Sequence, residues 1–182
     1  MNELSARVRM ASEAQPLPKM WIGFLLGIIF LVLEFIEDSA TKVPIVTWLV
    51  GLLIWFYWLY CVFKIHDAVG RIPGYRHPIT PAAAVAWHFV PVYNIYWIFK
   101  WPNKLAGFVN WRLQAKIMHG WIAGVLVFLA VLTFRLFDGF VGAMLLFGSG
   151  AYVSMQLRNA FSAPPIPQSA MASPVGTNIL GL

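Results

Sequence analysis

The segment Ile79–Trp101 constrains the fold most, because it is long and apolar but interrupted at its centre. It reads ITPAAAVAWHFVPVYNIYWIFKW and carries His88, Pro91 and Asn94 in its middle. Proline removes a backbone donor and breaks a helix, and lipid offers no partner for the carbonyl group that is left over. The segment therefore predicts re-entry, a kink or contact with other protein, rather than a plain transmembrane helix.

Composition indicates that lipid is the solvent for most of the chain. Of the 182 residues, 60% are hydrophobic and only 11% are charged, and the mean hydropathy is +0.71. A soluble domain of this size needs more charge to cover its surface. The net charge of +6 does not require nucleic acid, because the basic residues lie where membrane topology demands them and no recognition module for DNA or RNA is visible.

Four further apolar segments, at about 20–36, 43–63, 118–137 and 140–157, approach the roughly twenty residues that cross about 30 Å of hydrocarbon. We expect an all-α integral membrane protein with four transmembrane helices and a broken re-entrant or interfacial segment at 79–101. The alternative is five transmembrane helices, one of them kinked by proline. The helical membrane domain would cover residues 19–161, between a polar N-terminal segment at 1–18 and a flexible Pro/Ala/Ser-rich tail at 162–182.

The distribution of Lys and Arg favours four spans. Five spans would divide the thirteen basic residues seven to six between the two sides of the membrane. If the broken segment dips in and returns, eleven lie on one side and only Lys42 and Arg135 on the other. Because short cytoplasmic loops are enriched in Lys and Arg, we expect both termini and residues 64–117 on the cytoplasmic side.

The polar residues of the broken segment have a structural and a functional interpretation. Asn94 could cap a half-helix or bind a ligand, and capping is favoured. His88 could ligate a metal, haem or chlorin, or hydrogen-bond a neighbouring helix. His66, His77 and His119 have no close metal-ligand spacing, and we expect His66 and His77 in a loop. We therefore predict no metal or cofactor, with a chlorin or haem on His88 as the alternative.

Acidic residues gather near the outer end of the first span. Glu34, Glu37 and Asp38 have the i, i+3, i+4 spacing of one helix face, and Arg135 lies at the same predicted depth. Because an unpaired charge in a membrane is costly, we predict a structural ion pair between Glu34 and Arg135. A cation or proton entry site is the alternative.

Cations follow the broken segment in a region flanked by tryptophan. Arg112 and Lys116 are one turn apart, where like charges repel, and Trp111 fits the depth of the headgroups. We expect Lys104, Arg112 and Lys116 to contact anionic lipid headgroups. A solvated positive loop is the alternative.

Several short motifs resemble an uncharacterised family of small bacterial multi-pass membrane proteins, a domain of unknown function with a W-F-I-P-x-x-N-like signature. The similarity covers roughly residues 50–110 and includes WFYWLY at Trp55–Tyr60, KIHD at Lys64–Asp67 and FKWPN at Phe99–Asn103. The P-x-x-N core is matched by Pro91–Asn94, although His88-Phe89 replaces Trp-Phe. The resemblance implies a protein of the bacterial cytoplasmic (inner) membrane, without an assigned reaction or catalytic residues.

No catalytic constellation is visible in the sequence. There is no H-E-x-x-H or G-x-S-x-G motif and no pair of aspartates within the spans. We therefore expect no enzyme, but a non-catalytic accessory or scaffold subunit of a bacterial membrane protein complex, in contact with other membrane protein subunits. The alternative is a small transporter or channel with a polar site at the broken segment, because broken helices often line substrate or ion sites.

Overall fold

The computed structural model describes residues 16–39, 44–72, 75–136 and 138–163. Within these ranges all regular structure is helical, which confirms the predicted all-α class. The elements are α2 (Met20–Ser39), α3 (Pro44–Gly70), α4 (Pro81–Ala86), the 3₁₀ helix η1 (Trp87–Phe89), α5 (Tyr93–Leu113), α6 (Gly120–Leu136) and α7 (Gly139–Ser162). Most of the predicted polar segment 1–18 and of the predicted tail 162–182 lies outside the described residues.

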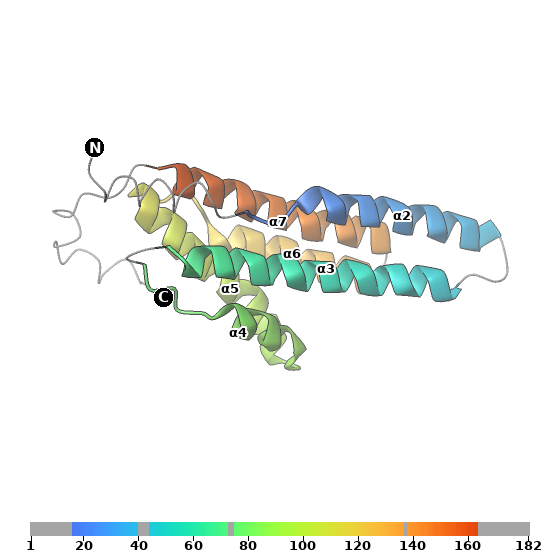
Figure 1. Cartoon of the computed structure of the whole chain (residues 1–182). Coiled ribbons are helices and arrows are strands. Elements are labelled where there is room, and N and C mark those ends of the chain that lie inside the picture. The colour runs from blue at the N-terminus through green and yellow to red at the C-terminus, as the bar shows by residue number, and fades with distance from the viewer. Residues whose placement is uncertain (1–15, 40–43, 73–74, 137, 164–182) are drawn as a thin grey trace.

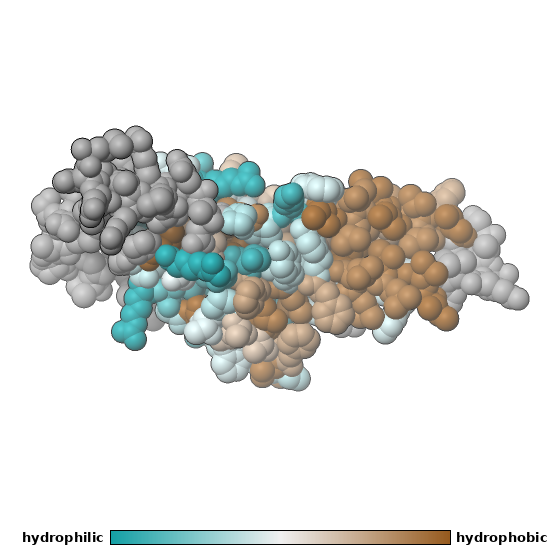
Figure 2. Space-filling view, viewed as in Figure 1, coloured by the Kyte–Doolittle hydropathy of each residue, from teal (hydrophilic) through white to brown (hydrophobic). Residues whose placement is uncertain are grey.

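Two of the described helices are long and apolar enough to cross a membrane, namely Ile45–Gly70 and Gly139–Ser162. Met20–Ile36 and Gly120–Phe134 are shorter apolar helices. The four lie along one axis in Figure 1, whereas α4 and the start of α5 project sideways from it. Figure 2 shows apolar side chains gathered at the end of the molecule where α2 meets the start of α3, and hydrophilic side chains gathered towards the other end.

Helix α7 is the centre of the bundle, because α2 and α6 both pack along it. Small residues allow these contacts. Gly23 of α2 lies against the ring of Phe147, and Gly142 of α7 lies against the backbone of Phe134 in α6. Gly124 of α6 approaches Phe99 of α5. The G-x-x-x-G spacings at 23/27 and 120/124 are typical of close helix packing, and here both pairs make their contacts within the chain.

The segment predicted to be broken folds into a helical hairpin. Thr80 caps α4 by accepting a hydrogen bond from the N–H of Ala83 (3.2 Å). After η1 the chain turns at Val92, whose φ of 63° is unusual for a β-branched residue, and α5 begins. The indole of Trp97 in α5 donates to the carbonyl of Ala84 in α4 (3.0 Å). This bond joins the two arms across the turn.

The two ends of the hairpin lie at the same end of the bundle. Tyr75, which precedes α4, packs against Phe108 and Trp111 near the end of α5, with ring centroids 4.8 and 5.3 Å apart. Asn110 then fixes the turn into α6 by accepting from the N–H groups of Ile117 (2.9 Å) and Met118 (2.8 Å). The chain therefore enters and leaves the hairpin on one side.

Helix α3 continues beyond the predicted boundary at residue 63. Hydropathy falls at Lys64, but Val62, Ile65 and Val69 are all buried and follow the i, i+3, i+7 spacing of one helix face. The helix therefore keeps a packed side to Gly70. This extension carries His66 into the protein interior and corrects the expectation that His66 lies in a loop.

We predict that Gly142→Ala destabilises the fold. A Cβ at this position would lie 2.6 Å from Cβ and 2.7 Å from Cα of Phe134, so α6 and α7 would have to separate, at a cost of about 1–3 kcal/mol. Gly148→Ala is the matched control on the same helix, because a Cβ there meets nothing within 4 Å. Thermal unfolding in detergent should show a lower Tm for Gly142→Ala alone. Equal Tm values for the two variants would contradict the packing described.

Candidate functional site

A pair of histidines joins α3 to the connection that follows it. His66 is fully buried near the end of α3, and His77 lies in the segment between α3 and α4. Nδ1 of His66 and Nε2 of His77 are 2.7 Å apart, a hydrogen-bond distance. The two rings are brought together although they are 11 residues apart in the chain.

Two neutral imidazole rings carry two ring N–H protons between them. A neutral imidazole carries one N–H and one acceptor nitrogen, so a single proton lies between the two rings. Whichever ring donates it, one of the outward nitrogens bears the second proton and the other a lone pair. Both outward nitrogens, Nε2 of His66 and Nδ1 of His77, are buried and have no hydrogen-bond partner in the described part of the chain. The two possible tautomeric arrangements differ in which of these outward nitrogens carries the second proton.

Aromatic side chains pack around His66. Trp101 of α5 meets its ring edge-on at 6.0 Å between centroids, and Trp58 of α3 meets Trp101 at the same distance. Both tryptophans are fully buried. The His66 side of the pair is therefore enclosed by aromatic rings.

His88 is held separately, in η1. Its Nδ1 lies 2.8 Å from the carbonyl of Ala84, and a carbonyl only accepts, so Nδ1 carries the proton of the neutral ring. The lone pair of Nε2 is then buried, without a partner among the described residues. A haem or chlorin at this nitrogen would have to displace the side chains that bury it. His88 thus fixes α4 and η1 through the same carbonyl that Trp97 uses.

The described residues contain no group of three or more His, Cys, Asp or Glu side chains placed to hold a metal ion. His66 and His77 supply two nitrogens, and these are hydrogen-bonded to each other. The pair is accordingly a hydrogen-bonded contact between α3 and the connection that follows it.

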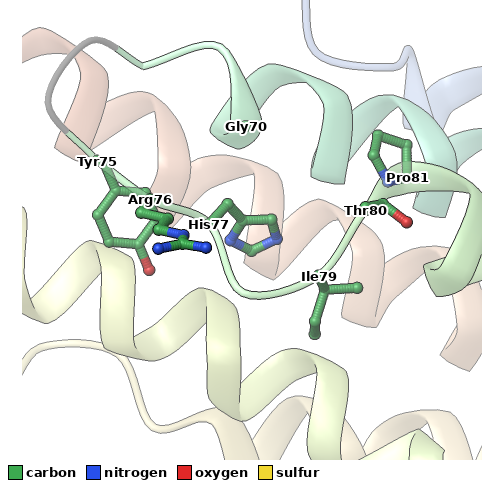
Figure 3. A pocket seen from close by; sticks show the side chains of 7 residues that line it. All are labelled: Gly70, Tyr75, Arg76, His77, Ile79, Thr80 and Pro81. Atoms are coloured by element: carbon green, nitrogen blue, oxygen red, sulfur yellow. The ribbon is translucent and has the colours of Figure 1, made fainter.

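A cavity of about 550 Å³ opens beside His77. It lies between the end of α3 and the segment that leads into α4 (Figure 3). Its walls combine polar and apolar side chains, contributed by Gly70, Tyr75, Arg76, His77, Ile79, Thr80 and Pro81. Burial lowers the pKa of His77 from its ordinary 6.5 to about 4, so this wall of the cavity is neutral at pH 7.

None of the break residues named by the sequence lines this cavity. Pro91 is exposed at the turn of the hairpin, and Asn94 is in the first turn of α5. The predicted cap is wrong, because Val92 occupies the N-cap position of α5 and makes no side-chain cap hydrogen bond. The side-chain oxygen of Asn94 is instead buried without a partner in the described chain.

The predicted headgroup cations have different surroundings. Arg112 donates to the carbonyls of Ala160 (3.3 Å) and Ala163 (2.9 Å), at the end of α7. Lys104 is half-buried and Lys116 is exposed. Their contact with lipid stays a prediction.

The Glu34–Arg135 ion pair also stays a prediction. The side chain of Arg135 lies outside the described residues, as do those of Glu37 and Asp38.

Sequence reasoning missed the His66–His77 pair, although half of its signal was present. Val62, His66 and Val69 share one helix face if the helix is extended past Lys64. The position of His77 depends on the path of the connection after α3, which no residue spacing specifies.

Comparison with known proteins gives no relative: no protein-family model, no curated protein and no solved structure matches this chain. Function must therefore be argued from the geometry of the fold and of the cavity.

We predict that the fold weakens in acid because His77 is neutral when folded. The pKa of His77 is about 4 in the folded protein against an ordinary 6.5, so between these pH values the unfolded chain binds more protons. The contribution of neutral His77 to the free energy of unfolding is therefore complete above about pH 6.5 and is lost as pH falls towards 4. His77→Gln keeps a neutral hydrogen-bonding side chain and should flatten the fall of Tm between pH 7.5 and 4.5. His119→Gln, which changes a histidine outside the pair, should keep the wild-type slope. An unchanged slope in His77→Gln would refute this account.

Proposed function

We propose that this protein spans the bacterial inner membrane four times, through α2, α3, α6 and α7, and acts as a non-catalytic accessory or scaffold subunit of a membrane complex. The apolar surface of α2 and α3 supports insertion. Exposed side chains on these helices include Trp21, Phe35 and Ile45, which are 60%, 75% and 72% accessible. Contiguous apolar surface of this kind suits lipid rather than water.

The helical hairpin of α4, η1 and α5 supports re-entry rather than a fifth crossing. Its two ends lie at the same end of the bundle, where Tyr75 meets Trp111. Both connections would then face the cytoplasm, in agreement with the excess of Lys and Arg in residues 64–117.

The tip of this hairpin is the surface through which we expect contact with another subunit. Its surface is apolar, with Phe89 60%, Val92 84% and Tyr96 55% accessible. Its backbone is irregular, with φ of 63° at Val92, a conformation that costs about 1–3 kcal/mol. Irregular backbone at membrane depth is tolerated where protein covers it, and the described chain leaves this tip open. We infer that a transmembrane helix of another subunit covers it.

The topology is tested first by cysteine labelling. In a Cys61→Ser background, single cysteines at Arg76 and Lys104 should react equally with an impermeant thiol reagent, and only from the cytoplasmic side. Cysteines at Ala82 and Gly107, which are exposed in the same two arms, provide a second pair. Opposite labelling of the two arms would establish a full crossing and remove the re-entrant hairpin.

The accessory role is tested by site-specific photo-crosslinking in native membranes. A photoreactive amino acid at Phe89 should give one discrete protein adduct, and the same group at Trp21, which is equally accessible on α2, should give lipid adducts only. Extraction in mild detergent should yield a particle larger than a homo-oligomer. Lipid adducts alone at Phe89, together with a particle containing only this chain, would overturn the proposal.

A transporter or channel is the second candidate function, because one observation favours it. The side-chain oxygen of Asn94 and Nε2 of His88 are buried near the break, and neither has a partner among the described residues. Polar groups of this kind line sites in broken transporter helices. Purified protein in liposomes should give no ion or solute flux if it is an accessory subunit. Selective flux that Asn94→Leu abolishes would favour the transporter instead.

A further inference from the structure

We propose that the cavity between the end of α3 and residues 75–81 is a binding site for the phosphate group of an anionic amphiphile, with Arg76 as its principal ligand. This site is distinct from the hairpin tip and from the cations Lys104, Arg112 and Lys116. It is an open depression of about 550 Å³ on the protein surface, a volume that would accommodate a small head group.

The charge of the cavity favours an anion. Arg76 lines it, and none of its other lining residues is acidic. The nearby carboxylate of Asp67 on α3 is engaged by Arg71, with an ion-pair distance of 2.8 Å. Arg76 is exposed and makes no ion pair within the described chain. Its guanidinium is therefore available, and its planar fork matches two phosphate oxygens at once.

Two residues with hydroxyl groups, Tyr75 and Thr80, also line the cavity. The oxygen of Thr80 accepts from the N–H of Ala83, which leaves its own O–H free to donate outward. The ring of Tyr75 is held between Phe108 and Trp111, and burial raises the pKa of Tyr75, so its hydroxyl stays protonated. In Figure 3, Tyr75 and Arg76 lie on one side of His77 and Thr80 on the other.

The apolar walls favour an amphiphile over a bare anion. Pro81, which is half-buried, lines the cavity beside the polar groups, and hydrocarbon packed on it would be removed from water. The hydrogen bond between His77 and His66 (2.7 Å) ties this connection to α3. That bond holds the wall in place without adding charge to it.

Native mass spectrometry of the full chain tests the site. Protein in detergent is titrated with phosphatidylglycerol, with phosphatidylcholine and, separately, with inorganic phosphate. We expect phosphatidylglycerol to bind the wild-type protein. Arg76→Gln should weaken this binding by about tenfold, because a charge-assisted hydrogen bond is lost. Tyr75→Phe should weaken the binding less. Arg158→Gln, which removes another exposed arginine from the end of α7, should change it less than twofold.

The outcomes are decisive in either direction. Loss of phosphatidylglycerol in Arg76→Gln but not in Arg158→Gln supports a lipid phosphate. The same pattern for inorganic phosphate alone supports a soluble phosphate compound at the same site. Equal losses in both arginine variants, equal binding of phosphatidylcholine, or no binding of either phosphate probe would overturn the proposal. If Arg76→Gln does not fold, Arg76→Lys, which keeps the charge but loses the fork, and Tyr75→Phe give the same comparison.

Discussion

Pairing of backbone N–H and C=O groups away from water is the constraint on which this architecture depends. Where the apolar half of the bundle is described, helices satisfy it, with Asp138 capping the start of α7 by accepting from the N–H of Val141 (2.9 Å). Each interruption elsewhere has its own partners: Thr80 caps α4, and Asn110 binds the backbone of Ile117 and Met118. At the tip, the N–H of Asn94 reaches the carbonyl of Val90 (3.0 Å). These interruptions follow the long apolar helix α3 and precede α6, so the bundle core stays uninterrupted.

The sequence predicts where the long helices begin better than where they end. The predicted starts at residues 20, 43 and 140 lie within one residue of α2, α3 and α7. The ends of α3 and α7 were placed too early, because hydropathy falls at Lys64 and Arg158 whereas one buried face continues past both, through Val69 and Ala160. A charged residue ends an apolar run without ending a helix.

The site was less predictable than the fold, for two physical reasons. The contact between His66 and His77 depends on how a connection turns back over α3, which involves tertiary packing and no local preference. The hairpin turn places a β-branched residue, Val92, at a positive φ that glycine or asparagine adopts more readily. Pro91 and Asn94 therefore mark the break in the sequence, but the predicted cap at Asn94 is wrong, because the turn forms at Val92.

The length of α3 gives the cavity a chemical environment of its own. Its 27 residues extend about 40 Å at 1.5 Å each, against about 30 Å of hydrocarbon, so in the proposed membrane its last turns reach the lipid headgroups. A surface potential of about −30 mV there concentrates protons and lowers the local pH by about half a unit. His77, in the wall of the cavity, then meets a more acidic medium than the bulk solution. The bulk pH at which His77 becomes protonated therefore rises by the same half unit, while the side chain stays neutral at pH 7 because its pKa is about 4.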